Sequence, residues 1–363
     1  MVTEWRDDRA MERALFLATR GRGRTSPNPL VGAVVVSPDG VVVGQGAHQR
    51  AGEAHAEVVA LDAAGDRARG ATLYCTLEPC CHVGRTGPCV ERITAAGVAR
   101  VVAAIEDPNP LVAGKGFAFL RGHGVEVSVG VGEPEARELN QPFFTLVTQR
   151  RPFVIAKAAV SADGRIAAAP GLRTPLTSAA ANRHAHRVRA EIDAIAVGSG
   201  TILIDDPLLT ARGPYRERPL ARVIFDRRLR TPSTARVLST VEAGPVIIVT
   251  TAEGASRADA RSRLEAAGAI VEIGDGTLAG ALKALGVRGV GSLLIEGGAT
   301  LHGAAWNEGL VDFVRLYITP HTLGAGGVPL FGGREFSTEA LVRRRVRALG
   351  PDTLIEGYVH GPR

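Results

Sequence analysis

The sequence His55-Ala56-Glu57, followed by Pro79-Cys80 and then by Cys89, restricts the fold and the function of this chain more than any other stretch. Histidine and cysteine bind zinc, and three such ligands leave the fourth tetrahedral position open for water, as in catalytic sites. Residues two apart on a helix point to nearly opposite sides, so His55 and Glu57 can face one metal only from the first turn. We therefore expect zinc beside a helix start, with Glu57 moving a proton between the water and the substrate.

The order of these residues is that of the zinc-deaminase signature, His-x-Glu followed by Pro-Cys-x-x-Cys. Here eight residues, rather than two, separate Cys80 from Cys89. Both cysteines are expected at or just before another helix start, where the helix dipole favours thiolates. Two alternatives stay open at this point. Cys81 or His82 could serve as a ligand or close a structural zinc site, or the cysteines could be buried thiols without metal.

Composition excludes several classes of protein. The chain has 363 residues, of which 45% are hydrophobic and 22% charged, values typical of a globular protein with about two domains. The net charge of +6 is scattered and only 4% of the residues are aromatic, which argues against nucleic acid as a partner. No apolar run is long enough to span a membrane, no signal peptide is evident, and all four cysteines lie between positions 75 and 89. We expect a cytoplasmic enzyme with no membrane partner and a metal cluster instead of disulfides.

Hydrophobic patterning predicts an alternation of strands and helices in the first part of the chain. β-Branched runs at 31–36 and 41–46 flank the turn Pro38-Asp39-Gly40 and indicate a hairpin. Further strands are expected at 71–77, 101–105 and 125–129, and helices at 54–64, 88–96, 116–121 and 133–148. The sequence therefore predicts an α/β domain over residues 1–149, with a linker at 149–152.

A second α/β domain is predicted over residues 150–363. Its strands are expected at 153–159, 194–197, 223–226, 246–250, 270–273, 293–296, 313–318 and 354–359, and its helices at 179–191, 257–267 and 299–307. Gly297-Gly298 stands at a helix start, where exposed N–H groups suit a phosphate, although close packing explains paired glycines equally well. Arg227 follows a strand, as an arginine that receives the extra phosphate of NADP often does, but a solvated charge is the plainer interpretation.

Three segments of the first domain resemble the deaminase half of the bifunctional riboflavin-biosynthesis deaminase-reductase family. They are Thr25–Gly32, Gly46–Gly52 with His55-Ala56-Glu57, and Leu77–Cys89, and Asp107-Pro108-Asn109-Pro110 matches a further segment. The resemblance implies a cytidine-deaminase-like three-layer domain with Zn²⁺ on His55, Cys80 and Cys89 and with Glu57 as the catalytic acid-base. It also implies a small-molecule pyrimidine ribosyl phosphate as substrate, contacted by Asn28, His48, His82, Arg85, Thr86, Asp107 and Asn109.

Segments of the second domain are similar to the reductase half of the same family, and Lys157–Arg165, Gly198–Thr201, Asp205–Arg212 and Glu296-Gly297-Gly298 carry this likeness. The resemblance implies a dihydrofolate-reductase-like fold and NADPH as cofactor. NADPH would be held by Ala159, Thr201, Asp205, Arg227, Gly298, Ala299, Thr300, Leu301, His302, Gly303 and Ala304. The substrate would meet Arg189, Leu209, Arg212 and Glu296.

Two features of the second domain leave its chemistry less defined. Asp205 could assist proton transfer at the ribose C1, or could cap the following turn together with Asp206. Arg173 and Pro175 stand where the family commonly has serine and tryptophan, so a stacking surface is missing.

The sequence thus predicts two successive activities: hydrolytic deamination of a diaminopyrimidinone phosphoribosylamine, then NADPH reduction of its ribosyl group to ribityl. A homo-oligomer is compatible with this prediction. The rival interpretations are a nucleic-acid base deaminase with a basic, non-reducing C-terminal module, and a zinc-stabilised interaction protein.

Overall fold

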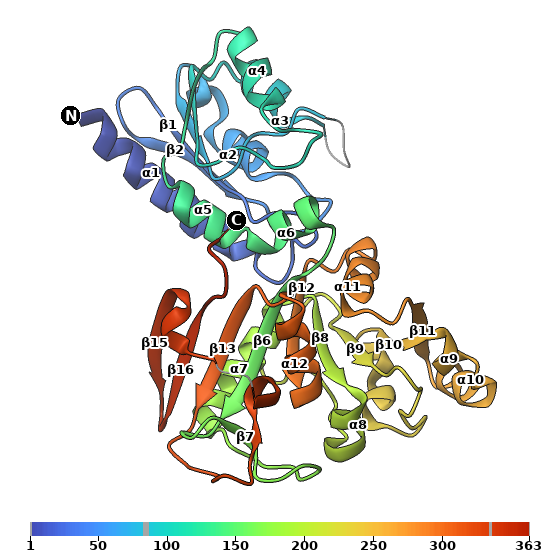
Figure 1. Ribbon diagram of the computed structural model, residues 1–363. Coiled ribbons are helices and arrows are strands. Elements are labelled where there is room, and N and C mark those ends of the chain that lie inside the picture. The colour runs from blue at the N-terminus through green and yellow to red at the C-terminus, as the bar shows by residue number, and fades with distance from the viewer. Residues whose placement is uncertain (1, 83–86, 334–335, 363) are drawn as a thin grey trace. The chain divides into compact units, whose positions relative to one another are not determined.

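The computed structural model describes residues 2–82, 87–333 and 336–362 (Figure 1). The chain divides into two compact units, Met1–Gln149 and Arg150–Gly361, each of which contains its own sheet. Among the helices of the described residues, none combines the length and the apolar composition that a membrane span requires.

The first unit contains a five-stranded sheet in the order β2-β1-β3-β4-β5. Strands β1, β2 and β3 pair antiparallel, whereas β3, β4 and β5 run parallel. Its strands are β1 (Gly32–Val36), β2 (Val42–Ala47), β3 (Thr72–Cys75), β4 (Arg100–Ala103) and β5 (Glu126–Val129). Its helices are α1 (Val2–Ala18), α2 (Ala56–Ala64), α3 (Cys89–Ala95), α4 (Lys115–Gly122), α5 (Glu133–Leu139) and α6 (Gln141–Gln149).

Helices cover both faces of this sheet, and glycines allow two of them to approach closely. A Cβ atom on Gly32 would lie 2.0 Å from the Ala14 carbonyl oxygen of α1, and one on Gly44 would lie 2.1 Å from the Ala60 carbonyl oxygen of α2. In the β1–β2 register Gly32 pairs with Ala47 and Val35 pairs with Gly44, so Gly32 and Gly44 point to opposite faces. The unit is therefore a three-layer α/β/α sandwich.

Two features of the first unit differ from the expectation. Helix α1 was not predicted, although Met11, Ala14 and Leu17 form a buried helical stripe. The single helix expected at 133–148 is two helices, which meet at Asn140. Asn140 lies between the two helices. Its side chain accepts a hydrogen bond from Leu30 N (2.8 Å) and donates one to Leu30 O (3.0 Å).

The second unit is built on a nine-stranded sheet in the order β11-β10-β9-β8-β12-β6-β13-β16-β15. Its strands are β6 (Phe153–Val160), β8 (Ala194–Gly198), β9 (Ala221–Phe225), β10 (Val246–Thr251), β11 (Ala269–Gly274), β12 (Ser292–Gly297), β13 (Phe313–Ile318), β15 (Val342–Leu349) and β16 (Asp352–Tyr358); β7 (Arg165–Ala167) and β14 (Val328–Pro329) pair separately. Its helices are α7 (Ala179–Glu191), α8 (Ser199–Asp205), α9 (Ala252–Ala255), α10 (Ala258–Ala266), α11 (Leu278–Val287) and α12 (Ala299–Asn307).

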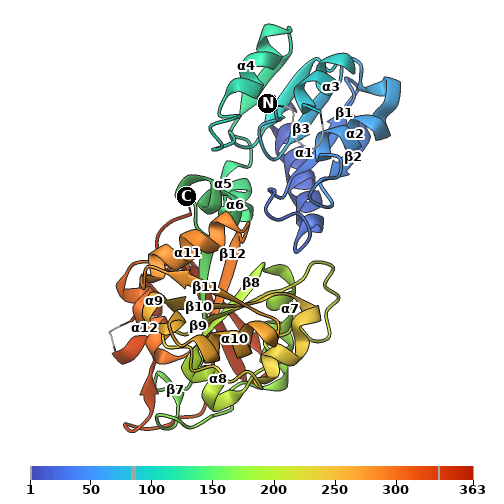
Figure 2. The ribbon, with the colours of Figure 1, turned by 90° about the vertical axis from the view of Figure 1, so that its right-hand side faces the viewer.

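The strands from β11 to β13 are parallel, and β16 and β15 extend the sheet antiparallel. Successive residues of the central strands join different cores: Leu293 packs with α11 and α12, and Leu294 packs with α7 and α10. Figure 2 shows α11 and α12 on one side of the strands and α7 on the other. Strand β15 was not predicted, because its side chains are almost all exposed and carry no apolar alternation.

The hydrogen bonds of Asn140 predict a loss of stability on substitution. The Asn140 side chain is 2% exposed, so Asn140→Ala leaves the Leu30 N–H and carbonyl unpaired and should lower the free energy of unfolding by ~2 kcal/mol in urea denaturation. Asn307→Ala, at the exposed end of α12, is the matched control and should change it by less than ~0.5 kcal/mol. Equal effects of the two substitutions would contradict this role of Asn140.

Candidate active sites

Three metal-binding side chains of the first unit converge at the starts of two helices. His55 is the N-cap of α2, with extended backbone angles (φ −72°, ψ 159°), and Cys89 is the first residue of α3. His55 Nδ1 lies 3.2 Å from Cys89 Sγ and 3.5 Å from Cys80 Sγ. One ligand atom from each of the three residues lies within 4.8 Å of the others. Zn–S bonds of about 2.3 Å and Zn–N bonds of about 2.0 Å need ligand separations of this size, so the three side chains fit zinc.

The electrostatics of the two sulfurs also favour a cation. A hydrogen bond joins Cys80 and Cys89. Together with the hydrogen bond to His55, it lowers the pKa of Cys80 to about 4, and it raises the pKa of Cys89. The pair therefore shares one proton, which a metal ion would replace. The backbone N–H of Cys89 donates to Cys80 Sγ at 3.4 Å, as expected for a thiolate at a helix start.

Glu57 lies in the first turn of α2 and is 3% exposed. Burial raises the pKa of its carboxyl group, and its Oε2 atom has no hydrogen-bond partner among the described residues. A buried, unpaired carboxylate oxygen is costly unless a ligand completes the site. Since Glu57 also contacts Cys89, the unpaired oxygen lies next to the ligand cluster and is suited to exchange a proton there.

Asn28 and His48 form a polar pair beside the cluster. Asn28 Nδ2 lies 3.3 Å from His48 Nε2, and His48 Nδ1 lies 3.2 Å from the carbonyl oxygen of Ala54. The His48 and His55 rings meet edge to face, with centroids 5.4 Å apart. Burial lowers the pKa of His48, so a neutral ring that donates from Nδ1 and accepts at Nε2 matches both contacts.

The two rival ligands lie outside the cluster. Cys81 packs against the hydrophobic core, and its sulfur points toward the Leu111 carbonyl oxygen at 4.0 Å. His82 is half-buried, and its Nδ1 atom has no partner among the residues that the structure describes. Cys75, expected in a strand core, is fully buried in β3. Arg85 and Thr86 lie outside the described residues.

Asp107 and Asn109 form a turn whose first residue, Asp107, donates its backbone N–H to Glu78. Asp107 is 7% exposed and accepts a hydrogen bond from Asn109 N at 2.8 Å, while Asn109 accepts one from Leu111 N at 3.1 Å. Burial raises the pKa of Asp107 to about 6.

Glu78 is a site-forming residue that the sequence analysis missed. Its buried carboxylate accepts hydrogen bonds from the backbone N–H groups of Gly114 and Gly116 (both 2.9 Å) and of Asp107 and Phe117 (both 3.2 Å). Gly116 is required there, because a Cβ atom would lie 2.2 Å from the Pro79 carbonyl oxygen. Glu78 therefore fixes the start of α4 against the Pro79-Cys80 segment. In the sequence, only the position of Glu78 two residues before the predicted ligand Cys80 could have indicated this role.

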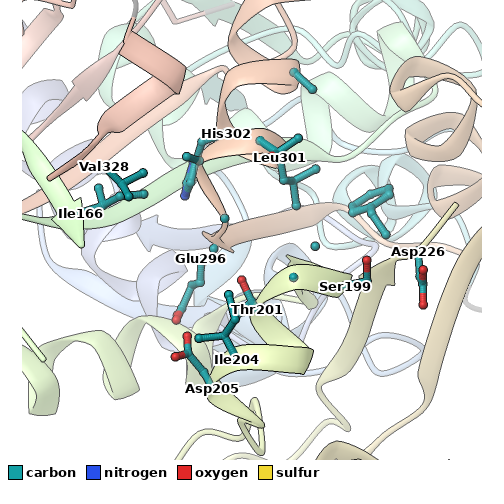
Figure 3. Close-up of a pocket in the computed structure, with 18 of the residues that line it drawn as sticks. Ile166, Ser199, Thr201, Ile204, Asp205, Asp226, Glu296, Leu301, His302 and Val328 are labelled. Atoms are coloured by element: carbon teal, nitrogen blue, oxygen red, sulfur yellow. The ribbon is translucent and has the colours of Figure 1, made fainter. Parts of the chain in front are cut away.

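The second unit contains a cavity of about 1120 Å³ at the carboxyl ends of its parallel strands. Residues at or just after the ends of β8, β9, β10 and β12 line it, in the position where open α/β sheets bind ligands. Figure 3 shows Thr201, Asp205 and Glu296 on one side of the cavity, and Leu301 and His302 of α12 across from them.

Most of the predicted cofactor residues line this cavity: Ala159, Thr201, Asp205, Arg227, Gly298, Ala299, Thr300, Leu301, His302 and Ala304. Gly303 is not in the lining and faces Phe331 instead. Gly298, at φ 82°, is the N-cap of α12 and supplies no capping side chain, so the first N–H groups of the helix suit a phosphate. The cavity volume, this helix start and the cation at Arg227 together fit a phosphorylated dinucleotide.

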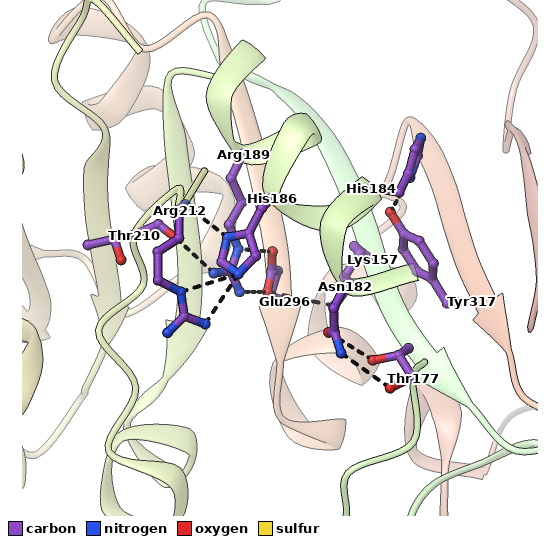
Figure 4. A network of polar contacts seen from close by, with 10 residues as sticks. All are labelled: Lys157, Thr177, Asn182, His184, His186, Arg189, Thr210, Arg212, Glu296 and Tyr317. Atoms are coloured by element: carbon purple, nitrogen blue, oxygen red, sulfur yellow. Dashed lines mark hydrogen bonds and ion pairs between the residues drawn. The ribbon is translucent and has the colours of Figure 1, made fainter. Parts of the chain in front are cut away.

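Of the four predicted substrate contacts, Glu296 lines the cavity and Arg189, Leu209 and Arg212 do not. Arg189 instead binds Glu296 through two hydrogen bonds of 2.7 and 2.6 Å, and a third goes to the Thr210 carbonyl oxygen at 2.9 Å (Figure 4). Arg212 contacts His186 through its backbone N–H and its guanidinium group. Leu209 is buried in the core on the α7 side.

Glu296, in the cavity lining, interacts with two cationic side chains, Lys157 and Arg189. Lys157 Nζ, which the sequence analysis did not assign, lies 3.8 Å from Glu296 Oε2. Burial opposes ionisation, but Lys157 and Arg189 lower the pKa of Glu296 to about 2. Glu296 is therefore a carboxylate at physiological pH and holds Lys157 in the cavity lining.

Asp205 and His302 are the other titratable groups of the lining. Asp205 Oδ1 is buried without a hydrogen-bond partner among the described residues, burial raises the pKa of Asp205, and Arg173 Nε lies 3.9 Å from Oδ1. The neighbouring Asp206 accepts a hydrogen bond from Arg236 N at 2.8 Å, so the two aspartates have different roles. Burial lowers the pKa of His302 to about 4, which keeps its ring neutral.

Comparison with known proteins agrees with both sites. Residues 4–105 match the family model of the cytidine and deoxycytidylate deaminase zinc-binding region, and residues 152–355 match that of the RibD C-terminal domain. The riboflavin biosynthesis protein RibD of Aquifex aeolicus is 43% identical over 96% of this chain and 97% of its own, and that of Escherichia coli is 40% identical over 96% and 98%.

Solved structures give the same result over the whole chain. RibD of Acinetobacter baumannii superposes with a TM-score of 0.86 at 37% identity, covering 98% of this chain and 99% of its own. The Thermotoga maritima diaminohydroxyphosphoribosylaminopyrimidine deaminase and 5-amino-6-(5-phosphoribosylamino)uracil reductase superposes with a TM-score of 0.85 at 33% identity, with the same coverage.

Fold and sites define a zinc-dependent deaminase joined to an NADPH-dependent reductase in one chain. The chain belongs to the RibD family, the bifunctional deaminases and reductases of riboflavin biosynthesis. The predicted fold class, with a cytidine-deaminase-like first domain and a dihydrofolate-reductase-like second domain, is confirmed.

The ligand cluster predicts which cysteines retain zinc. Cys89→Ala should reduce bound zinc from about one equivalent to a small fraction, because it removes one of three ligands. Cys81→Ala is the matched control and should leave the metal content unchanged, since Cys81 is not one of the three clustered ligands and its sulfur contacts the Leu111 carbonyl oxygen instead. Zinc would be measured by mass spectrometry of the purified proteins. Loss of zinc from the Cys81 variant would show that the ligand set is different.

The pKa of Glu296 predicts a pH-dependent loss of stability. The value falls from an ordinary 4.5 to about 2, so the stabilisation is complete above pH 4.5 and is lost as the pH falls through about 2. In urea denaturation, Glu296→Gln should cost ~3 kcal/mol at pH 7 and roughly half of that at pH 3. Glu265→Gln removes one partner of an exposed ion pair and should cost less than ~0.5 kcal/mol at either pH. A cost for Glu296→Gln that does not depend on pH would exclude this linkage.

Proposed function

We propose that the first unit deaminates 2,5-diamino-6-(5-phosphoribosylamino)pyrimidin-4(3H)-one, and that the second unit reduces the ribosyl group of the resulting 5-amino-6-(5-phosphoribosylamino)uracil to ribityl. The observation that carries this proposal is the three-ligand cluster with the unpaired Glu57 carboxylate beside it. Full-length similarity to the deaminase and reductase of Thermotoga maritima supports the same pair of substrates.

In the deaminase site, His55, Cys80 and Cys89 would hold zinc, and three protein ligands leave one position for water. Zinc bound there supplies a Lewis acid that activates water for attack on the amino-bearing ring carbon. Glu57 accepts a proton from that water and delivers it to the departing amino group, so that a C–N bond breaks, a C–O bond forms and ammonia leaves. Asn28 and His48 offer an amide and a neutral imidazole to the polar edge of the pyrimidine.

Loop residues would complete this site. His82, Arg85 and Thr86 belong to the segment between the two cysteines, and we assign them, with Asp107 and Asn109, to the ribosyl phosphate and the ring. The raised pKa of Asp107, about 6, lets this carboxyl group exchange a proton at a pH slightly below neutral.

In the reductase site, the start of α12 and Arg227 would hold the phosphates of NADPH, and Ala159, Thr201 and Asp205 would border its reactive end. NADPH supplies a hydride to the ribose C1, which becomes electrophilic when the sugar ring opens. Asp205, with its raised pKa, would exchange the accompanying proton. Glu296 would orient the substrate and hold Lys157, while Arg189 positions Glu296 from outside the lining.

The proposed setting is the cytoplasm, where cysteine thiols stay reduced. All four cysteines of the chain are free thiols, which agrees with that compartment. The proposed partner is a small pyrimidine ribosyl phosphate, and the scattered charge and the 4% of aromatic residues in the sequence argue against nucleic acid.

Glu57→Gln separates the two activities. Without its acid-base group the deaminase should release ammonia about 10²- to 10⁴-fold more slowly, and zinc content should be unchanged. NADPH oxidation with the deaminated intermediate as substrate should stay at the wild-type rate, because the reductase cavity is in the other unit. Ammonia and NADPH are measured separately, by a coupled assay and by absorbance. Normal ammonia release by the Glu57 variant would contradict the proposed mechanism.

A further inference from the structure

Lys157 lines the reductase cavity, and its ammonium group makes no hydrogen bond to a residue that the structure describes. The residue belongs to β6, and its side chain is 14% exposed. Two groups attract Nζ from greater distances: Glu296 Oε2 lies 3.8 Å away, and the centroid of the Tyr317 ring lies 5.4 Å away. A tyrosine ring attracts a cation that lies over its face within about 6 Å. The position of the ammonium group therefore depends on Tyr317 as well as on Glu296.

Tyr317 belongs to β13 and packs on the α7 side of the sheet. Its side chain is fully buried against Ala181 and Ala185 of α7. The hydroxyl oxygen lies 2.8 Å from Nδ1 of His184, another residue of α7 (Figure 4). A buried hydroxyl group is costly without a hydrogen-bond partner, so this bond favours one orientation of the ring.

The His184 ring is oriented in turn by an arginine of β15. Arg347 Nη2 lies 2.8 Å from His184 Nε2. Because a guanidinium group only donates, Nε2 accepts and Nδ1 carries the ring proton. Burial, together with Arg315 and Arg347, lowers the pKa of His184 to about 4. The ring is therefore neutral at physiological pH and donates from Nδ1 to the Tyr317 oxygen.

Of the residues in this series of contacts, only Lys157 lines the cavity, whereas Tyr317, His184 and Arg347 lie outside the lining. Tyr317 and His184 therefore act on a ligand of the cavity only through Lys157. A lysine side chain is a flexible stem that ends in one compact charge. With Glu296 alone to attract it, the ammonium group could move around the carboxylate, and the ring of Tyr317 opposes that movement.

We propose that Tyr317, oriented by His184, is a positioning residue of the reductase, whose ring holds the Lys157 ammonium group in its place beside Glu296. This inference rests on the proposed function, because it takes the cavity to be the site of NADPH oxidation. Loss of the ring leaves the charge in the cavity but not its position. Since a misplacement of about 1 Å can lower a rate on the order of 10²-fold, we expect the effect mainly in kcat.

The test measures steady-state NADPH oxidation by full-length variants with the deaminated intermediate as substrate. Tyr317→Leu removes the ring and should lower kcat about tenfold or more, with KM changed less than about threefold. Tyr317→Phe keeps the ring and loses only the bond to His184, so it should recover most of kcat, to within about threefold of the wild type. Tyr358→Leu, which removes a buried tyrosine of β16 that packs on Phe153 and Phe313, is the matched control and should leave kcat within about twofold of the wild type.

A double-mutant cycle tests the role of His184 with variants that disturb the core less. His184→Leu should lower kcat by about the same factor as Tyr317→Phe, and the two substitutions together should lower it no further, because both remove one hydrogen bond. Ammonia release should be unchanged in every variant, because the zinc ligands are in the other unit. The dissociation constant of NADPH, measured by fluorescence, should also be unchanged.

The possible failures are distinguishable. A wild-type protein that oxidises NADPH, together with a Tyr317→Leu variant of wild-type kcat or one that loses no more activity than Tyr358→Leu, would overturn the inference and leave the proposed function standing. If Tyr317→Leu does not fold, the cycle decides: multiplicative losses in the double variant would show that Tyr317 and His184 act independently and would contradict the inference. A wild-type protein that does not oxidise NADPH would overturn both the inference and the proposed function.

Discussion

Two cysteine sulfurs and a histidine nitrogen lie within 4.8 Å of one another and could hold one metal ion, and the first unit is arranged around this cluster. Helices α2 and α3 bring their starts to one place, so that backbone N–H groups and helix dipoles favour the thiolates. The glycines of β2 let α2 lie close to the sheet, and the hydrogen bonds accepted by Glu78 hold the Cys80 segment against α4. Glu57 is then buried beside the cluster with one oxygen unpaired, an arrangement that is costly for stability and useful for proton transfer.

The second unit also places its site at helix starts, but for phosphates instead of a metal ion. Its parallel strands end at one edge, where glycines and helix starts leave backbone N–H groups available to phosphates. One buried carboxylate, Glu296, holds Lys157 and Arg189 and stays ionised because they surround it. Asp205 has the opposite environment, in which burial raises its pKa and a single distant arginine lowers it. The pKa values of two carboxylates of one cavity are thus shifted in opposite directions because their surroundings differ.

The sequence predicted the parts of this architecture that leave a local pattern. The spans of α7 and α12 were predicted as the structure has them, because both lie between predicted strands, and paired glycines precede α12. The ligand triad was predicted because zinc chemistry restricts residue type and order.

Strand β15 was missed because its exposed arginines show no alternation, and the break between α5 and α6 was missed because it depends on Leu30, 110 residues away. Glu78 and Lys157 were missed for the same reason, since their roles come from long-range contacts. The engagement of Arg189 with Glu296 is likewise a tertiary contact that no local pattern encodes.

The central claim is that the metal site has three protein ligands, two of them sulfurs, and one position left for water. X-ray absorption at the zinc K-edge of the purified full-length protein tests it directly, because sulfur and nitrogen or oxygen ligands differ in bond length. The account predicts two sulfurs at about 2.3 Å and two nitrogen or oxygen ligands at about 2.0 Å. A shell with three or four sulfurs, or one that loses a sulfur when Cys81 is replaced by alanine, would contradict it.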